Sequence, residues 1–224
     1  MKRNNIFIAC DTTNISKIKK IIKETKTNKL NIGYKFGLEF LNSYNGREFI
    51  SSLRNKIIFG DYKFLDIPNT CASAISAIKD LKFNYITIHI SSGLEALKAA
   101  KKVAGKTKLI GVTVLTSLDN RLLKEIGFNN NIKHLVVKQA KLAKKANLDA
   151  IVCSADEVKI VKKVFKKEII TPGIRYGSDN KDDQRRIATP SKAYRLGSDW
   201  IVIGRPITKG NIKKNIQKLI NHLN

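Results

Sequence analysis

Residues 85–114, YITIHISSGLEALKAAKKVAGKTKLIGVTV, contain the pattern that decides the fold. They open with one apolar, β-branched run, Tyr85–His89, and close with another, Lys108–Val114. Between these runs lie apolar residues at spacings of three and four, namely Leu94, Leu97, Ala100 and Val103. This spacing predicts an amphipathic helix. A strand, a helix and a second strand in this order indicate a parallel βαβ unit.

The same alternation continues on both sides of this segment. Six further strand-like runs are Ile6–Cys10, Leu30–Gly33, Lys56–Phe59, Ala150–Cys153, Glu168–Thr171 and Trp200–Ile203. Apolar residues with helical spacing follow several of them: Ile15, Ile18, Ile21 and Ile22, then Ile160, Val161 and Val164, and finally Ile212, Ile216, Leu219 and Ile220. The stretch Leu118–Asn147 has room for two helices, and Asn14, Ser92 and Ser154 are candidate helix caps. Eight such units favour an α/β fold of one domain, residues 1–224, closed as a (β/α)8 TIM barrel.

The composition points at first to a different class of protein. The chain carries 43 Lys and Arg against 18 Asp and Glu, a net charge of +25. A basic surface is typical of nucleic-acid binders, but these lysines fall mostly on the polar faces of predicted helices. No basic tail, zinc finger or aromatic ribonucleoprotein motif accompanies them. We therefore expect no specific nucleic-acid partner, and a nucleic-acid-binding protein remains the alternative from another class.

The apolar runs and the cysteines indicate where the protein works. No run approaches the roughly 18 apolar residues of a membrane span, and the N-terminus is too short in apolar residues for a signal peptide. We expect a cytoplasmic protein without a membrane partner. The three cysteines, Cys10, Cys71 and Cys153, are far apart and are predicted to be reduced core thiols. The histidines lack the paired spacing of a metal site, so no metal is expected.

Charged residues of alternating sign gather where the second and third strands end. Asp61 and Lys63 are two residues apart and would share one side of an extended strand, while Asp66 lies in the following turn. Lys35 ends the preceding strand at the same rim. Carboxylates flanked by ammonium groups stay ionised, so the set is electrostatically self-consistent. From these residues alone, a plain ion-pair network is as good an interpretation as a catalytic site.

Arginines and a glycine after the last strands suit a phosphate group. Arg175 follows the seventh predicted strand and can pair a phosphate with two hydrogen bonds. Gly204 lets backbone N–H groups approach a ligand, and Arg205 adds a second guanidinium. Loops after the seventh and eighth strands are the usual phosphate site of this architecture. The polar stretch Tyr176–Arg186, also in this region, is predicted to be a functional loop.

The run DYKFLDIPNT, residues 61–70, resembles the D-x-K-x-x-D-I-P-N-T signature of the orotidine 5'-monophosphate (OMP) decarboxylase family. Further landmarks match in order at Asp11, Lys35, residues 112–117, 171–175 and 203–208. The similarity runs from about Ile6 to Thr208. It implies an enzyme that converts OMP to UMP and CO2 in pyrimidine biosynthesis, without a metal or cofactor.

The resemblance also implies a role for each matching residue. The catalytic set is Lys63, Asp61, Asp66 and Lys35, with Lys63 delivering a proton to C6 of the pyrimidine. Substrate contacts are implied for Asp11, Lys35, Asp61, Ile67, Thr70, Thr116, Arg175, Gln184, Gly204 and Arg205. Asp66, Ile67 and Thr70 would reach a neighbouring subunit's site, which implies a homodimer. Asp11 and Thr116 could instead be helix caps, Thr70 an ordinary first-turn residue and Gln184 an exposed loop amide.

Two positions depart from the family pattern, and one position separates the family from its relatives. Ser92 and Asp182 each stand where the family usually has glycine. Sugar-phosphate decarboxylases such as 3-keto-gulonate 6-phosphate decarboxylase share the D-x-K-x-x-D run but place a glutamate on the second strand and use Mg²⁺. Here Lys35 stands at that position, and a cation where a metal ligand is needed favours the nucleotide enzyme.

Overall fold

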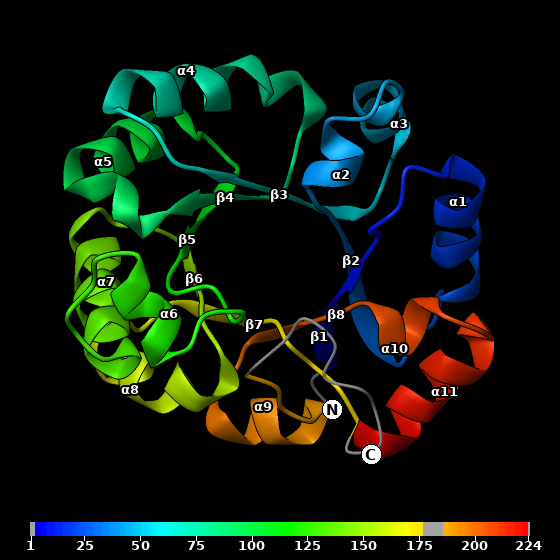
Figure 1. Cartoon of the computed structure of the whole chain (residues 1–224). Coiled ribbons are helices and arrows are strands. Elements are labelled where there is room, and N and C mark those ends of the chain that lie inside the picture. Colours follow the sequence, from blue (N-terminus) through cyan, green and yellow to red (C-terminus); the bar gives the residue numbers. More distant parts are fainter. Residues whose placement is uncertain (1–2, 177–185, 224) are drawn as a thin grey trace.

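A computed structural model describes residues 3–176 and 186–223 of the chain. Eight parallel strands close into a barrel in chain order (Figure 1), as the sequence predicts. The strands are β1 (Asn4–Ala9), β2 (Leu30–Phe36), β3 (Ile57–Phe64), β4 (Tyr85–His89), β5 (Lys108–Val112), β6 (Ala150–Val152), β7 (Glu168–Thr171) and β8 (Trp200–Ile203). Strand β8 pairs with β1 from Asn5↔Trp200 to Ile8↔Ile203, which closes the ring.

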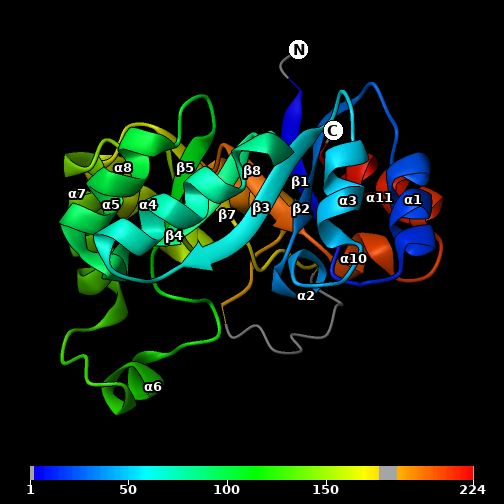
Figure 2. The same ribbon diagram turned by 90° about the horizontal axis from the view of Figure 1, so that it is seen from above.

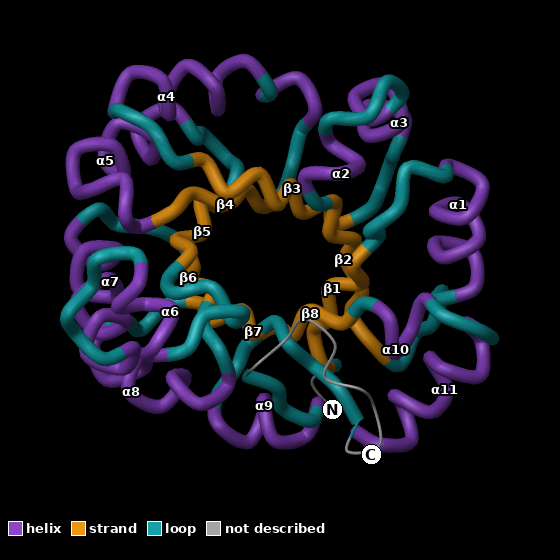
Figure 3. Tube along the Cα trace, in the orientation of Figure 1, coloured by secondary structure: helices purple, strands orange, loops and turns teal. Residues whose placement is uncertain are grey.

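Helices surround this barrel as an outer ring (Figure 3). The α-helices are α1 (Ile15–Glu24), α2 (Leu38–Leu41), α3 (Gly46–Ser52), α4 (Pro68–Ala77), α5 (Gly93–Val103), α6 (Asn120–Glu125), α7 (Ile132–Lys145), α8 (Val158–Val164), α9 (Pro190–Leu196), α10 (Arg205–Thr208) and α11 (Ile212–Leu223). Three short 3-10 helices are η1 (Lys79–Leu81), η2 (Ile90–Ser92) and η3 (Ala155–Glu157). Helix α6 stands away from this ring, beyond the barrel (Figure 2).

Aromatic side chains fill the inside of the barrel near the starts of β4 and β8. Phe7 lies at the centre of this group: its ring stacks on Trp200 at 4.1 Å between centroids and meets Phe59 edge-on at 5.0 Å. Tyr85 packs against Phe7 from β4 at 5.2 Å. A side-chain carbon at Gly33 would come within 2.6 Å of the Phe7 ring, so glycine is needed there. This packed aromatic layer is the floor of the barrel.

Two apolar layers between barrel and helices follow from the sequence periodicity. In the first, Ile18 and Ile21 of α1 pack with Ile216 of α11 against the outer face of the barrel. In the second, Leu97 of α5 and Val136 of α7 belong to the layer over β4 to β6. Because the strands are covered outside by helices and filled inside by side chains, both of their faces are apolar. Burial of this kind is the main free-energy contribution to the folded state.

The predicted helices and caps are largely confirmed. The segment 118–147 contains two helices, α6 and α7. Asn14 caps α1 by accepting a hydrogen bond from the backbone of Lys17, and Ser154 forms a capping box with Glu157. Ser92 is different, because it ends a 3-10 turn and its side chain makes no capping bond to α5.

The structure also tests the predictions about cysteines and membrane spans. Cys10, Cys71 and Cys153 are buried and free, as predicted. Among the helices in the described part of the chain, none combines the length and the apolar character needed to cross a membrane.

Candidate active site

A pocket opens at the ends of the strands, on the face where their C-terminal residues meet. It has a volume of about 330 Å³. That volume lies in the range of roughly 300–1,000 Å³ found for small-molecule sites. Eight residues predicted as site residues line it: Asp11, Lys35, Asp61, Lys63, Thr116, Arg175, Gly204 and Arg205. Thus residues from β2 and β3, from the loops after β1, β5, β7 and β8, and from the start of α10 converge on one space.

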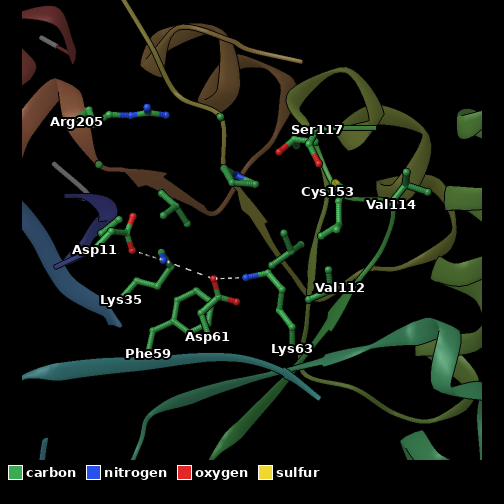
Figure 4. A pocket seen from close by; sticks show the side chains of 18 of the residues that line it. Asp11, Lys35, Phe59, Asp61, Lys63, Val112, Val114, Ser117, Cys153 and Arg205 are labelled. Atoms are coloured by element: carbon green, nitrogen blue, oxygen red, sulfur yellow. Dashed lines mark hydrogen bonds and ion pairs between the residues drawn. The ribbon is translucent and has the colours of Figure 1, made fainter. Parts of the chain in front are cut away.

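Four charged side chains form a continuous chain along one wall of this pocket (Figure 4). Lys35 Nζ lies 3.1 Å from Asp11 Oδ1 and 3.5 Å from Asp61 Oδ2. Lys63 Nζ donates to the same Asp61 oxygen at 2.7 Å. A side-chain carbon at Gly37 would lie 3.3 Å from Asp11 Oδ1 and 3.4 Å from Lys35 Nζ, so a larger residue would crowd this pair.

Mutual pairing keeps the central groups ionised despite their burial. Burial alone would raise the pKa of Asp61, but Lys35 and Lys63 outweigh it, and the pKa is held below its ordinary value. Burial alone would lower the pKa of Lys35, but Asp61 and Asp11 outweigh it, and the pKa is raised. Burial, together with the nearby Lys63 ammonium, lowers the pKa of His89 at the end of β4.

Lys63 reaches the pocket by a backbone conformation that the sequence analysis did not foresee. An extended strand was expected to bring Asp61 and Lys63 to one side, but Lys63 has a φ of 52°, in the left-handed region. Strand β3 bulges here, because its register with β4 shifts between Gly60 and Phe64. The bulge, and not strand alternation, therefore orients Lys63. A non-glycine residue with positive φ is uncommon and is often found at functional sites.

The second carboxylate predicted for this cluster, Asp66, lies elsewhere in the subunit. Asp66 is exposed, does not line the pocket, and accepts a hydrogen bond from the backbone N–H of Ile67. Asp11, rather than Asp66, completes the ion-pair chain within one subunit. Ile67 and Thr70 are also exposed and outside the pocket, and Pro68 begins α4. The turn after β3 therefore points away from this subunit's own cavity.

The three described residues expected to hold a phosphate, Arg175, Gly204 and Arg205, all line the pocket. Arg205 extends from the side opposite Lys63 (Figure 4). Arg175 is buried, and its guanidinium donates to the carbonyl oxygen of Ile174 at 2.9 Å. Gly204 lines the pocket close to Ala9 and Asp11: a side-chain carbon there would lie 3.4 Å from Ala9 Cβ and 3.9 Å from Asp11 Oδ2. Gln184 and Asp182 lie outside the described residues.

Sequence reasoning missed a buried ion pair that holds one wall of the pocket. The guanidinium of Arg186 pairs with the carboxylate of Glu157, which is 2% exposed. It also donates to the carbonyl oxygens of Val114 and Leu115, each at 3.0 Å. Val114 and Leu115 both line the pocket. The capping-box spacing of Ser154 and Glu157 is the signal that could have found Glu157.

The donor set of the pocket is that of an ammonium-neutralised site. Lys35 lies between the carboxylates of Asp11 and Asp61, where a metal ion would otherwise have to neutralise them. Within residues 3–176 and 186–223, no three His, Cys, Asp or Glu side chains are grouped to hold a metal ion. The arrangement can hold an anionic ligand and present a protonated amine to it.

Comparisons with known proteins agree with this geometry. The profile of the orotidine 5'-phosphate decarboxylase / HUMPS family matches residues 4–218. The orotidine 5'-phosphate decarboxylase of Wolbachia sp. subsp. Brugia malayi is 44% identical over 224 residues, covering 97% of each chain. That of Coxiella burnetii (strain RSA 493 / Nine Mile phase I) is 44% identical over 174 residues, covering 73% of this chain and 74% of the relative.

A solved structure extends this similarity to three dimensions. The crystal structure of orotidine 5'-phosphate decarboxylase from Lactobacillus acidophilus superposes with a TM-score of 0.83 and 30% sequence identity, covering the whole of both chains. Sequence similarity and fold therefore point to the same enzymes. The chain belongs to the orotidine 5'-phosphate decarboxylase / HUMPS family and is a carboxy-lyase of the orotidine 5'-phosphate decarboxylase type.

Proposed function

We propose that this carboxy-lyase converts OMP to UMP and CO2 without a metal or cofactor, and that Lys63 delivers the proton that replaces the departing carboxylate. One observation carries this proposal. An ammonium group, Lys63 Nζ, is held in the pocket at 2.7 Å from a buried carboxylate, while Arg205 lies across the same space. This separation suits a substrate with a reacting ring at one end and a phosphate at the other.

The reaction breaks the bond between C6 and its carboxylate. CO2 leaves, the electron pair remains on C6, and a proton from Lys63 Nζ forms the new C–H bond. The ammonium stabilises the negative charge that develops on C6, and once bound substrate displaces water from the pocket this attraction is far stronger than in bulk solvent. Asp61 holds Lys63 in place through the ion pair at Oδ2. Solvent then returns a proton to Lys63.

Remote groups of the substrate supply binding energy. Arg175 and Arg205 bind the phosphate in the proposed complex, and Gly204 keeps the approach open. Lys35 and Asp11 contact the ribose, and Thr116 lies beside the pyrimidine. Binding energy from the non-reacting phosphate can then be used to orient the reacting ring against Lys63. Gln184 is proposed as a further phosphate contact.

The proposed active unit is a homodimer in which each subunit completes its neighbour's site. Asp66, Ile67 and Thr70 are exposed and follow the same strand as Asp61 and Lys63. Ile67 is 65% exposed and Leu65 59% exposed, so this turn presents apolar surface that a second copy would cover. Asp66 of the partner would thereby add a further carboxylate to the four charged side chains along one wall of the subunit's own pocket. A cytoplasmic location is also proposed, because three free buried thiols suit a reducing compartment.

The absorbance of OMP in the near ultraviolet tests the reaction. Wild-type protein in EDTA should convert the spectrum of OMP to that of UMP, and Lys63→Ala should not. Decay by the wild type alone would support the activity, its independence from metal and the role of Lys63 together. No decay by folded protein would contradict the proposal and make a sugar-phosphate substrate with Mg²⁺ the next assay.

Substitutions at the two ends of the pocket should have different kinetic effects. Lys63→Ala removes the proton donor, so turnover should be abolished while the Kd for UMP changes little. Arg205→Ala removes a guanidinium proposed to bind phosphate, so KM should rise by about tenfold or more, as for loss of a charge-assisted hydrogen bond. Calorimetric UMP binding and steady-state kinetics give both quantities. Equal losses of kcat and of affinity in each variant would refute this division of roles.

A further inference from the structure

The bulge in β3 leaves three residues opposite one residue of β4. Gly60 pairs with Ile86, and Phe64 pairs with Ile88. Between these pairs, Asp61, Tyr62 and Lys63 lie on one strand and Thr87 alone on the other. The regular ladder therefore cannot satisfy the backbone N–H of Lys63 through a carbonyl of β4.

The side chain of Thr87 takes over that function. Its hydroxyl oxygen accepts a hydrogen bond from the backbone N–H of Lys63 at 2.8 Å. The same hydroxyl donates its proton to Asp61 Oδ1 at 3.0 Å. Thr87 is fully buried, with 0% of its surface exposed, so water does not compete for these bonds. One hydroxyl thus joins the backbone of Lys63 to the carboxylate of Asp61.

These contacts form a closed hydrogen-bond network of Lys63, Thr87 and Asp61, with the proposed proton donor as one member. Asp61 Oδ1 faces Thr87, while Asp61 Oδ2 receives Lys63 Nζ at 2.7 Å. Thr87 therefore fixes the rotation of the carboxylate, and the carboxylate fixes the ammonium. Through its bond to the backbone N–H, Thr87 also stabilises the left-handed conformation of Lys63. Such a conformation persists only where surrounding contacts stabilise it.

We propose that Thr87 is a positioning residue for decarboxylation: its hydroxyl sets the backbone of Lys63 and the carboxylate of Asp61 so that the ammonium meets the reacting carbon. This inference rests on the proposed role of Lys63 as proton donor. Thr87 does not line the pocket, so it acts through these two residues and not by touching substrate. A small displacement of a reacting group lowers the rate of the chemical step more than it lowers the affinity for substrate.

A matched set of variants tests this role. Thr87→Val keeps the shape and removes the hydroxyl, and we expect kcat to fall by about 10- to 100-fold, as for loss of a hydrogen bond to a charged group. KM for OMP and Kd for UMP should stay within about twofold, because no substrate contact is lost. Thr87→Ser, which keeps the hydroxyl, should recover most of kcat.

Thr25→Val is the control for the loss of a buried threonine hydroxyl. Thr25 is also 0% exposed, and its hydroxyl contacts the carbonyl oxygen of Ile21 at 2.7 Å and Tyr34 Oη at 3.0 Å, outside the pocket. This variant should lose stability without losing kcat. If Thr87→Val does not fold, Thr87→Cys allows the same comparison, because a thiol is a weaker donor and acceptor.

The outcomes separate this inference from the proposed function. An active wild type with unchanged kcat in Thr87→Val overturns the inference alone. A parallel loss of kcat and UMP affinity, or no recovery in Thr87→Ser, also overturns it, since the role would then be merely structural. An inactive wild type overturns the proposed function, and the inference falls with it.

Discussion

Asp61 is the residue on which the charge balance of the pocket depends. Its carboxylate is within 3.5 Å of two ammonium groups, and its side chain is 12% exposed. Without this carboxylate, Lys35 and Lys63 would lose the anion that lies between their two ammonium groups. Breaking a buried ion pair from one side costs about 3–5 kcal/mol. The same substitution would release the ammonium of Lys63 from its hydrogen bond.

Asp61→Asn should therefore lower both turnover and stability, with a defined dependence on pH. We expect kcat to fall by more than about 100-fold and the free energy of unfolding by about 3 kcal/mol at pH 7. The pKa of Asp61 is lowered in the folded state, so its contribution is present above pH 4 and is lost as the pH falls. The pKa of Lys35 is raised, so its contribution is present at neutral pH and is lost only in strong alkali.

Urea denaturation between pH 3.5 and 9 checks this prediction. The difference in stability between wild type and Asp61→Asn should be constant between about pH 5 and 9. It should begin to shrink below about pH 4, where Asp61 of the unfolded chain takes up a proton before Asp61 of the folded protein does. A difference that grows on acidification would contradict the assigned pKa direction. Glu95→Gln is a suitable control, because Glu95 belongs to an exposed pair on α5 with Lys98.

At single positions, the sequence predicted which residues form the site better than it predicted their backbone geometry. Lys35, Asp61 and Lys63 were expected at one rim and line one pocket. The left-handed Lys63 was not expected, because a bulge depends on how two strands pair and leaves no mark in residue spacing. Thr87 was missed for a related reason: a β-branched residue in a buried strand is ordinary until its hydroxyl partners are known.

Among the elements, η3 and the loop after β5 are joined by one buried guanidinium. Arg186 pairs with Glu157 and holds two carbonyl oxygens of residues 114 and 115. Ser154 supports the carboxylate by donating its backbone N–H to Glu157 Oε2 at 2.8 Å. This network connects the start of α8 to the pocket wall beside Thr116. The position of the pocket wall at Val114 and Leu115 thus depends on Arg186, which is not itself part of that wall.

A double-mutant cycle on Glu157 and Arg186 tests this connection. Each of Glu157→Gln and Arg186→Met should cost about 3 kcal/mol of stability, because each leaves a buried group without its partner. The double variant should cost clearly less than the sum. The KM for OMP should rise in Arg186→Met as the wall loosens. Chemical denaturation and steady-state kinetics measure these effects.

A nearby exposed ion pair is the control for this cycle. Lys192 pairs with Asp156 of the same 3-10 helix, and both side chains are about half exposed. Lys192→Met should change stability by less than about 0.5 kcal/mol. Additive losses in the Glu157 and Arg186 cycle would show that the pair is not coupled and would remove its proposed role.

The elements themselves were predictable because their signal is periodic. The strand positions and the two helices between residues 118 and 147 follow from apolar spacing. Strands β2 and β3 run three and five residues past the predicted Gly33 and Phe59. These extensions contain the charged residues Lys35, Asp61 and Lys63, which line the pocket and interrupt the apolar runs, so hydrophobicity could not mark where the strands end.

For the whole molecule, the proposed dimer makes each active site the product of two chains. Asp66 is exposed in the subunit, whereas Asp61 and Lys63 line its pocket. Inactive Lys63→Ala and Asp66→Asn subunits should therefore complement each other after mixing and refolding. In a mixed dimer, one site carries both changes and the other carries neither. Random pairing makes half of the dimers mixed, so about a quarter of the wild-type activity should return.

Sedimentation of the mixture and a rate assay check this expectation. Each variant refolded alone is the control and should remain inactive at every concentration. No recovery in dimeric mixtures would mean that Asp66 serves its own chain. A monomeric and fully active wild type would contradict the shared site as a whole.

The packed floor of the barrel determines by which end substrate and products enter and leave the enzyme. Phe7, Tyr85 and Trp200 fill the barrel beneath the pocket, and Phe59, which packs on Phe7, lines the pocket itself. A ring closed at its base is a cup with its mouth at the C-terminal ends of the strands, and not a tunnel. A nucleotide substrate must enter and leave by this mouth, and in the proposed reaction the CO2 formed beside Lys63 must leave through the same opening. Release is thus ordered by shape, with the small product able to slip out before the large one.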